Sequence, residues 1–456
     1  MSMMKTIVLL LFICLGTLQA DPFQKAQTEV RTRSHAEVSY EQQMAAREKT
    51  AILVAKLLHK PLTVASAVQI ALLNNRELQA TFCEVGIAQA DLIAAVTFPN
   101  PSINFEVEFP NSGTSFNRYM WFIAQDFAQM VMTPLKKKIA EEQLEAVQWH
   151  VATEALTLVA KVKEAYVTYQ AEQQLLARLQ IIQETNAAAL ELSQKQFKAG
   201  NTTDLALLQS QSNYSQGKME LLKVETDLRN QREKLNRLLG LWGGAVSWKI
   251  QGEIMPVATI DFSIQHLESL AVMQRLDLRA AHRELTSIVS ALGLTKTYRW
   301  TPVLNIGFMG ERDIQPALNM GPAFSLELPI FNQGQARIAH GEAQLRMAEN
   351  KLEALAVNIR SEVRELRDRL ISLASTAQYY QKDLLPLRIS IVNKALLQYN
   401  AMQLSAYELF MIKAQEVEVE RDYIATLRDY WITRAELERV VGGTLTPRQQ
   451  HLGISQ

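Results

Sequence analysis

Two glutamates, Glu106 and Glu108, stand two positions apart in a segment whose residues alternate between apolar and polar. A pair of nearby carboxylates can carry out general acid–base catalysis. Residues two apart on an extended strand point to the same side, so both carboxylates can equally well face water. The spacing of the remaining residues supports no Ser-His-Asp or Cys-His arrangement. The sequence therefore predicts no catalytic residue, and we expect that the protein is not an enzyme.

Metal and cofactor chemistry has little support in the sequence. Gly240-Leu241-Trp242-Gly243-Gly244 lacks the Lys-Ser/Thr pair of a phosphate-binding loop and is expected to close a helix instead. Met130 and Met132 place two thioethers close together, which would suit a soft ion such as Cu(I), but methionine more often fills a core. We expect no metal site and no cofactor, because metal-ligand spacing is missing among the histidines: His35, His59, His150, His266, His282, His340 and His451.

Composition narrows the class of protein. The 456 residues carry 47 basic and 47 acidic side chains, so no overall field attracts nucleic acid. Hydrophobic residues make up 48% and charged residues 21%, which is typical of an ordered protein. Glycine and proline, with 18 and 13 copies, cluster at a few places, as expected of a chain dominated by long helices.

Four segments have the period of two that predicts strands, near residues 101–109, 118–127, 302–310 and 321–331. Strands of about ten residues with one apolar and one polar side are typical of an outer-membrane β-barrel, and the alternative is a pair of hairpins on a soluble core. The polar side is predicted to line the lumen at Asn104, Glu106, Glu108, Asn305, Ser325 and Glu327. The apolar side is predicted to face lipid at Ile103, Phe105, Val107, Leu304, Ile306, Phe308, Phe324 and Leu326.

The N-terminus has the pattern of an export signal. Lys5 precedes an apolar run over residues 7–15, which is too short to span a bilayer as a helix, and cleavage is predicted between Ala20 and Asp21. Cys14 could instead be a lipoprotein cysteine, but it lies inside the apolar run. Export and the absence of any other apolar run of about twenty residues favour the barrel. Since small barrels need about eight strands, four strands require the chain to oligomerise.

Long helices account for most of the remaining sequence. From Leu144 the apolar positions step by three or four, which predicts an amphipathic helix. A helix over residues 135–197 would be roughly 95 Å long, at 1.5 Å per residue. The whole pattern occurs twice at an offset of about two hundred: Leu62-Thr63-Val64 is answered by Phe262-Ser263-Ile264. The two similar halves of the chain are therefore expected to build one symmetric structure.

This layout resembles the TolC family of outer-membrane efflux channels over about residues 60–443. Residues 62–78 are similar to the family's opening helix. The resemblance is also carried by Phe98-Pro99-Asn100-Pro101-Ser102, Phe197-Lys198-Ala199-Gly200 and Leu328-Pro329-Ile330-Phe331-Asn332-Gln333-Gly334. It implies a mainly α fold with a small β part: a trimer with a shared twelve-strand outer-membrane barrel and a periplasmic coiled-coil tunnel. It also implies that the protein is a passive conduit in the outer membrane of a Gram-negative-type cell and extends into the periplasm.

Residues 398–403 and 427–438 look most like the branch of the family that serves heavy-metal efflux. That likeness implies a homotrimer partnered by a periplasmic adaptor protein and an inner-membrane pump of the resistance–nodulation–division type. The leading expectation is the export of metal ions or other small molecules. Outer-membrane lipid is a further expected partner, and binding of nucleic acid is not expected. The alternatives are the conduit of a type I protein secretion system and a periplasm-spanning structural coiled coil.

The repeat gives the expected organisation of the chain. A signal peptide over residues 1–20 precedes an N-terminal periplasmic segment, 21–61, whose composition is helical. The two efflux repeats are predicted over residues 62–243 and 262–443. They are joined by a linker over 244–261 and followed by a flexible tail over 444–456.

The turns at the ends of the long helices are the predicted docking tips for the adaptor. In the first turn Gly200 can close a helix in the left-handed conformation, and Thr203 or Asp204 can cap the next helix. The second turn contains Met402 and Ser405, with methionine where the first turn has glycine. We therefore expect the second turn to be shaped differently.

Overall fold

The structure is a computed structural model that describes residues 21–40, 44–109, 117–257, 266–300, 303–312 and 318–445. The predicted signal peptide, including Ala20 of the cleavage site, lies outside these residues, as does the tail from residue 446 onward. The described elements are helices and one four-stranded antiparallel sheet. The prediction of a mainly α fold with a small β part is confirmed.

The chain divides into two compact units. The sheet unit consists of Thr81–Val151, Leu276–Val357 and the described residues up to Ala26. The tip unit consists of Gln27–Ala80, Ala152–Arg275 and the described residues from Asn358 onward. Four helices contribute residues to both units: α2 (Gln24–Ser34), α5 (Arg76–Val96), α6 (Phe127–Lys198) and α10 (Gln335–Tyr379).

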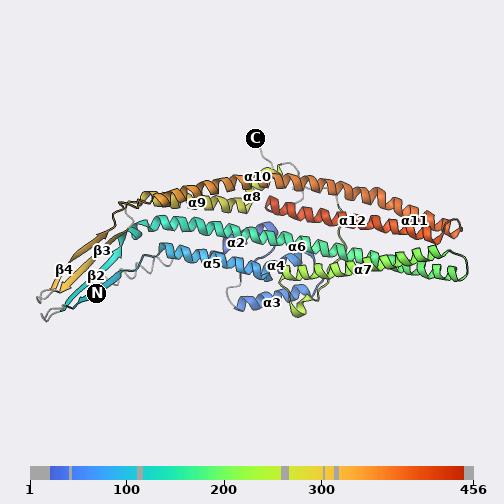
Figure 1. Cartoon of the computed structure of the whole chain (residues 1–456), viewed down its shortest axis with the longest axis horizontal. Helices are drawn as coiled ribbons and strands as arrows, with labels where there is room; N and C mark the ends of the chain where they lie inside the picture. Colours follow the sequence, from blue (N-terminus) through green and yellow to red (C-terminus); the bar gives the residue numbers. More distant parts are fainter. Residues whose placement is uncertain are drawn as a thin grey trace. The chain divides into compact units, whose positions relative to one another are not determined.

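The strands of the sheet unit lie in the order β1-β2-β3-β4, and Figure 1 shows them side by side. The first two, β1 (Ser102–Glu108) and β2 (Arg118–Asp126), fall where the sequence predicted them. The third, β3 (Leu304–Arg312), is shifted slightly toward the C-terminus. The fourth, β4 (Leu318–Leu326), begins before the predicted span of 321–331 and ends well inside it.

Pro322 lies inside β4, and its place there depends on where β4 lies in the sheet. Proline has no amide hydrogen, so in sequence it argues against a strand. Pro322 pairs with Phe308 of β3, and β4 is an edge strand of the described sheet, where a missing donor is tolerated. Glu327, a predicted lumen residue, lies one position past β4, and its N–H donates to the Val303 carbonyl at 3.3 Å.

Each repeat contains a long helix that turns back into a shorter one within the tip unit (Figure 1). In the first repeat α6 is a single helix of 72 residues, which contains the predicted span 135–197, and α7 (Asp204–Leu239) returns from it. Its buried residues include five of the expected positions, Val151, Ala155, Leu158, Val162 and Ala165, together with neighbours such as Ala152 and Tyr166.

The long helix of the second repeat is interrupted by a π turn. α10 leads into the π-helix η2 (Tyr380–Leu384), then into α11 (Leu385–Asn400), and α12 (Ala406–Val441) returns. Leu385 donates its N–H to the Tyr380 carbonyl, five residues back. Pro386 follows in the first turn of α11, where it has no N–H to donate, so the wider turn fits the proline into a continuing helix.

The opening segment over residues 62–78 is not the single helix that the sequence predicted. It is broken at Asn75, between α4 (Val64–Asn74) and α5. The Asn75 side chain accepts a hydrogen bond from the Leu78 N–H and donates one to the Leu238 carbonyl, both at 2.9 Å. One asparagine therefore caps α5 and ties the break to the end of α7.

The duplication is visible where the returning helices end. α7 closes at Gly240 and α12 at Gly442, both with left-handed backbones, at φ 66° and 87°. A Cβ at Gly240 would lie 2.5 Å from the Asn74 carbonyl oxygen, and one at Gly442 would lie 3.3 Å from that of Gln274. Asn74 and Gln274 end α4 and α8 (Leu267–Gln274), and a single residue separates each of them from the start of α5 or α9 (Leu276–Thr297). Each repeat therefore needs glycine at the same joint.

The N-terminal segment contains α2 and α3 (Met44–Leu58), as its helical composition predicted. Arg33 of α2 donates to the Gln274 carbonyl at 2.6 Å and to the Gly442 carbonyl at 2.7 Å. A single guanidinium thus satisfies carbonyl groups at the C-terminal ends of α8 and α12.

Candidate functional site

The pairing register of the four strands sorts their side chains onto two faces, because residues directly opposite each other in antiparallel strands share a face. We call them the apolar face and the polar face. All the predicted lipid-facing residues share the apolar face: Ile103, Phe105, Val107, Leu304, Ile306, Phe308, Phe324 and Leu326. The polar face contains every predicted lumen residue except Glu327: Asn104, Glu106, Glu108, Asn305 and Ser325.

The apolar face is exposed in the single chain. Phe105 is 66% exposed and Phe324 is 80% exposed. Trp121 of β2 lies on the same face, with its ring 6.5 Å from that of Phe308. Gly310 makes room for this indole, since a Cβ there would lie 2.4 Å from the ring. An exposed apolar face of this kind marks a surface that contacts a membrane or another protein.

The polar face contains an ion cluster that the sequence did not predict. Arg118 donates from Nε to Glu311 at 2.6 Å, and its Nη1 lies 3.3 Å from a carboxylate oxygen of Glu108. Arg118 pairs directly with Glu108 across β1 and β2, whereas Glu311 belongs to β3. The weak alternation of β2 hid this arrangement, because the register between β2 and β3 cannot be read from either strand alone.

The middle of the polar face is less polar than predicted. Phe122 of β2 pairs with Met309 of β3, and Met120 stands between Glu106 and Glu311 in one row. Asp126 pairs with Asn305 at the end of β2 from which α6 begins. Charged residues therefore lie toward both ends of the polar face, with an apolar stretch between them.

The first tip, residues 199–204, has the predicted glycine turn. Gly200 has φ 73° and donates its N–H to the Phe197 carbonyl at 3.0 Å, while the Asn201 N–H donates to the Gln196 carbonyl at 2.9 Å. Thr203 is the residue that caps α7, since its hydroxyl accepts from the Ala206 N–H at 3.3 Å. Asp204 is the first residue of α7 rather than its cap.

The second tip, residues 401–406, is not shaped differently, so that expectation was wrong. Met402 has φ 57°, and its N–H donates to the Tyr399 carbonyl at 3.0 Å. The Gln403 N–H donates to the Gln398 carbonyl at 2.9 Å, which completes the hydrogen-bond pattern of the first tip. Ser405 then caps α12. The backbone pattern overrides the poor fit of methionine to a left-handed conformation.

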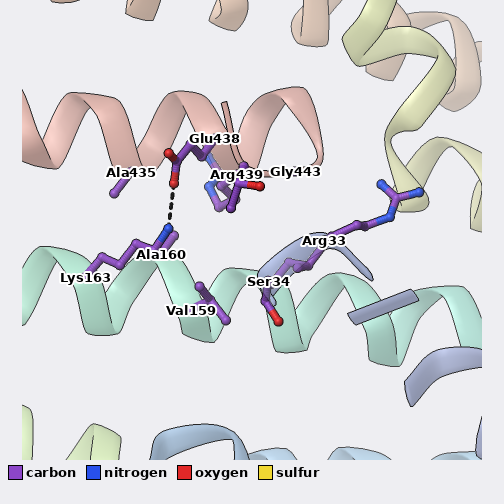
Figure 2. A pocket seen from close by; sticks show the side chains of 11 residues that line it. Arg33, Ser34, Val159, Ala160, Lys163, Ala435, Glu438, Arg439 and Gly443 are labelled. Atoms are coloured by element: carbon purple, nitrogen blue, oxygen red, sulfur yellow. Dashed lines mark hydrogen bonds and ion pairs between the residues drawn. The ribbon is translucent and has the colours of Figure 1, made fainter. Parts of the chain in front are cut away.

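A small pocket lies where α2, α6 and α12 meet (Figure 2). Lys163 of α6 and Glu438 of α12 form an ion pair at 2.6 Å across it. Its volume of about 20 Å³ has room for a single water molecule. Figure 2 shows Arg33 reaching away from Lys163, consistent with its bonds to the helix ends, so the pocket is a packing joint rather than a ligand site.

Metal chemistry gains no support from the described residues. They contain no group of three or more His, Cys, Asp or Glu side chains arranged to hold a metal ion. Met130 and Met132 lie in the first turns of α6, where positions two apart point about 200° from each other, so the two thioethers do not converge.

No helix in the described part of the chain combines the length and the apolar character needed to cross a membrane.

Known proteins resemble this chain in sequence and fold. Residues 67–241 match the family described as Outer membrane efflux protein. The cobalt-zinc-cadmium resistance protein CzcC of Cupriavidus metallidurans is 19% identical over 84% of this chain and 90% of its own. The probable outer membrane lipoprotein SilC of Salmonella typhimurium is 24% identical over 52% of this chain, and the match spans about half (53%) of SilC. The crystal structure of CusC, 18% identical, has a TM-score of 0.69 over 83% of this chain and 92% of CusC.

These likenesses define the class of fold, which is that of the solved outer-membrane channels, and they identify residues 67–241 as a match to an outer-membrane efflux family. The predicted resemblance to the TolC family of outer-membrane efflux channels is confirmed over residues 67–241, and the cobalt-zinc-cadmium resistance protein CzcC supports the predicted likeness to the heavy-metal branch. Its location in the outer membrane follows from the same matches. The family is one of channels rather than enzymes.

Proposed function

We propose that this protein is the passive outer-membrane conduit of a tripartite efflux pump. The observation that carries the proposal is the division of the sheet into an apolar face and a polar face by the strand register. In a barrel wall the apolar face would contact lipid, and the polar face would line water.

Cysteine labelling tests this assignment of the faces. In the assembled protein in membranes, a water-soluble thiol reagent should label a cysteine at position 106 much faster than one at position 105. Phe105→Arg should cost about 2–4 kcal/mol if that residue lies mid-membrane, and Glu106→Arg should cost much less. Cys83 is the one described cysteine, so it is replaced by serine in every variant. Equal labelling at the two positions would contradict the proposal.

The proposed assembly is a homotrimer in which each protomer contributes four strands to a twelve-strand barrel. The described sheet leaves β1 and β4 as open edges, and four strands are fewer than the roughly eight that a small closed barrel needs. Three copies would pair β4 of one protomer with β1 of the next. Native gel electrophoresis of the purified protein should show trimers that dissociate only on strong denaturation.

The proposed partners are a periplasmic adaptor, docked at the tips, and an inner-membrane pump of the resistance–nodulation–division type. Both tips have exposed turns with defined backbones, and Met402 is 95% exposed. Crosslinking from position 402 should capture a periplasmic adaptor protein. Capture from an exposed site away from the tips, such as Trp242, should fail in the same experiment.

The proposed cargo is metal ions or other small molecules, in line with the name of CzcC. A strain that lacks this gene should become sensitive to cobalt, zinc or cadmium, and the intact gene should restore growth. Unchanged metal sensitivity together with lost secretion of a protein substrate would instead favour a type I secretion conduit. A purely structural coiled coil would give no conductance in planar bilayers.

A further inference from the structure

We propose that Arg118 moderates the preference of the channel for cations at one end of the sheet. This inference rests on the proposed conduit function, because it assumes that the polar face lines the pore. It assigns a specificity-determining role to a residue that the strand alternation alone did not single out.

Arg118 bridges three strands. Its partners are Glu108, the last residue of β1, and Glu311, one residue before the end of β3, at the distances given above. Arg118 itself is the first residue of β2, so all three residues lie at the end of the sheet where each hairpin turns. The opposite end is the one from which α6 continues after Asp126.

The side chains of the cluster are partly exposed, so ions in the surrounding water can reach them. The side chains of Arg118, Glu108 and Glu311 are 39%, 50% and 23% exposed. Arginine suits this position because its planar guanidinium can meet two carboxylates at once, which the ammonium of lysine does less well. Arg118 therefore holds two acidic side chains in place and cancels the charge of one.

The remaining charge at this end is negative. Glu106 stands one row further into the sheet on the same face, and no ion pair of Glu106 is found among the described residues. Three carboxylates and one guanidinium leave two uncompensated negative charges per protomer at this end of the polar face. Threefold repetition would concentrate that charge in one ring, and a charged ring in a pore selects ions of opposite sign. Arg118 would thus moderate a preference for cations.

Arg312 supplies a matched control. It lies at the same end of the sheet, but its pairing with Tyr119 and Leu318 places it on the apolar face. Replacing Arg312 changes the net charge of the protein as much as replacing Arg118 does. The two variants differ in the face from which the charge is removed.

The experiment measures reversal potentials of purified channels in planar bilayers under a salt gradient. Arg118→Gln should raise the ratio of cation to anion permeability by about twofold or more near 0.1 M salt, and the rise should shrink near 1 M, where screening acts within about 3 Å. Arg118→Lys and Arg312→Gln should keep the wild-type ratio. Glu106→Gln should lower it, which gives a second measurement if Arg118→Gln does not assemble.

The outcomes separate this inference from the proposed function. A wild-type protein that assembles but never conducts would overturn the conduit function itself. Channels that conduct normally while Arg118→Gln leaves the ratio unchanged would overturn only the role of Arg118. A shift in Arg118→Lys equal to that in Arg118→Gln would also overturn it, because lysine keeps the charge.

Discussion

The two tips have the same backbone but are built from different residues. Gly200 and Met402 occupy equivalent left-handed positions, at φ 73° and 57°, and each is followed three residues later by a capping hydroxyl. The first tip uses the residue best suited to the turn and a single cap from Thr203. The second uses a poorly suited residue and a stronger cap.

The stronger cap is a reciprocal one. Ser405 accepts from the Glu408 N–H at 3.2 Å, and the Glu408 carboxylate accepts from the Ser405 N–H at 3.0 Å. The first tip has Ala206 at the position of Glu408, so it cannot form the second bond. We infer that the capping box offsets the cost of a left-handed methionine, which is about 1 kcal/mol. The same turn can therefore form with an unstrained glycine and a single cap, or with a strained methionine and a capping box.

Gly200→Val should have the largest effect among the tip variants. A β-branched residue in the left-handed region costs about 2 kcal/mol or more, although no atom outside the turn would clash with its Cβ. Met402→Val should cost less, because the second tip already has a side chain in that conformation. Thermal melting by circular dichroism measures both.

Gly200→Val also tests adaptor docking. We expect efflux to be lost, as measured by metal susceptibility, while trimers persist on native gels. Loss of trimers together with efflux would show that the turn is a folding element and would contradict the docking role.

Removing the caps should have the next largest effect. Ser405→Ala should cost about 1–2 kcal/mol and Thr203→Ala nearer 0.5–1 kcal/mol, since only the second tip loses a reciprocal pair. Denaturation of the two variants under one set of conditions gives the difference. Equal losses would show that the capping box does not offset the strain of Met402.

Met402→Gly should stabilise the second tip by up to about 1 kcal/mol, because glycine adopts the left-handed conformation without a Cβ penalty. Methionine at this exposed position would then be retained for a reason other than stability. A neutral or destabilising outcome would mean that the Met402 side chain makes a contact that stabilises the tip by at least as much as the left-handed backbone destabilises it.

The smallest expected effect is a pH dependence confined to the second tip. The hydrogen bonds from the Ser405 N–H and hydroxyl lower the pKa of Glu408 below its ordinary value of 4.5. A lowered folded-state pKa stabilises the tip above pH 4.5, and this contribution is lost as the pH falls through the folded-state pKa. Melting curves of the wild type and Glu408→Gln should therefore differ at pH 6 and converge in acid. The first tip has no acid at the equivalent position and should show no such dependence.

The tips also show which features can be predicted from sequence. The turn at Gly200 and the cap at Thr203 follow from local preferences, so the sequence predicts them. The left-handed conformation of Met402 does not, because methionine has no such preference and the hydrogen bonds of the turn impose it.

In the sheet, too, local features can be predicted from the sequence, whereas features that depend on distant residues cannot. The alternation in β1 locates that strand and its faces, since both depend on neighbouring residues. The pairing of Arg118 with Glu311 spans 193 residues of sequence and depends on how β2 meets β3. Proline argues against a strand in sequence, but Pro322 is tolerated in β4 because that strand lies at an edge, which is a property of the whole described sheet rather than of the segment.

The π turn at Tyr380–Leu384 has a consequence for how the two repeats diverged. The offset between them is 200 at the helix breaks, from Asn74 to Gln274, and 202 at the tips, from Gly200 to Met402. One residue inserted into an α-helix rotates everything beyond it by about 100°, which would turn the apolar side away from its neighbours. A π turn takes up one extra residue within a single turn, so it can absorb one of the two extra residues and keep the phase of α11. One repeat could thus become longer than the other without any change in which later helix positions are apolar.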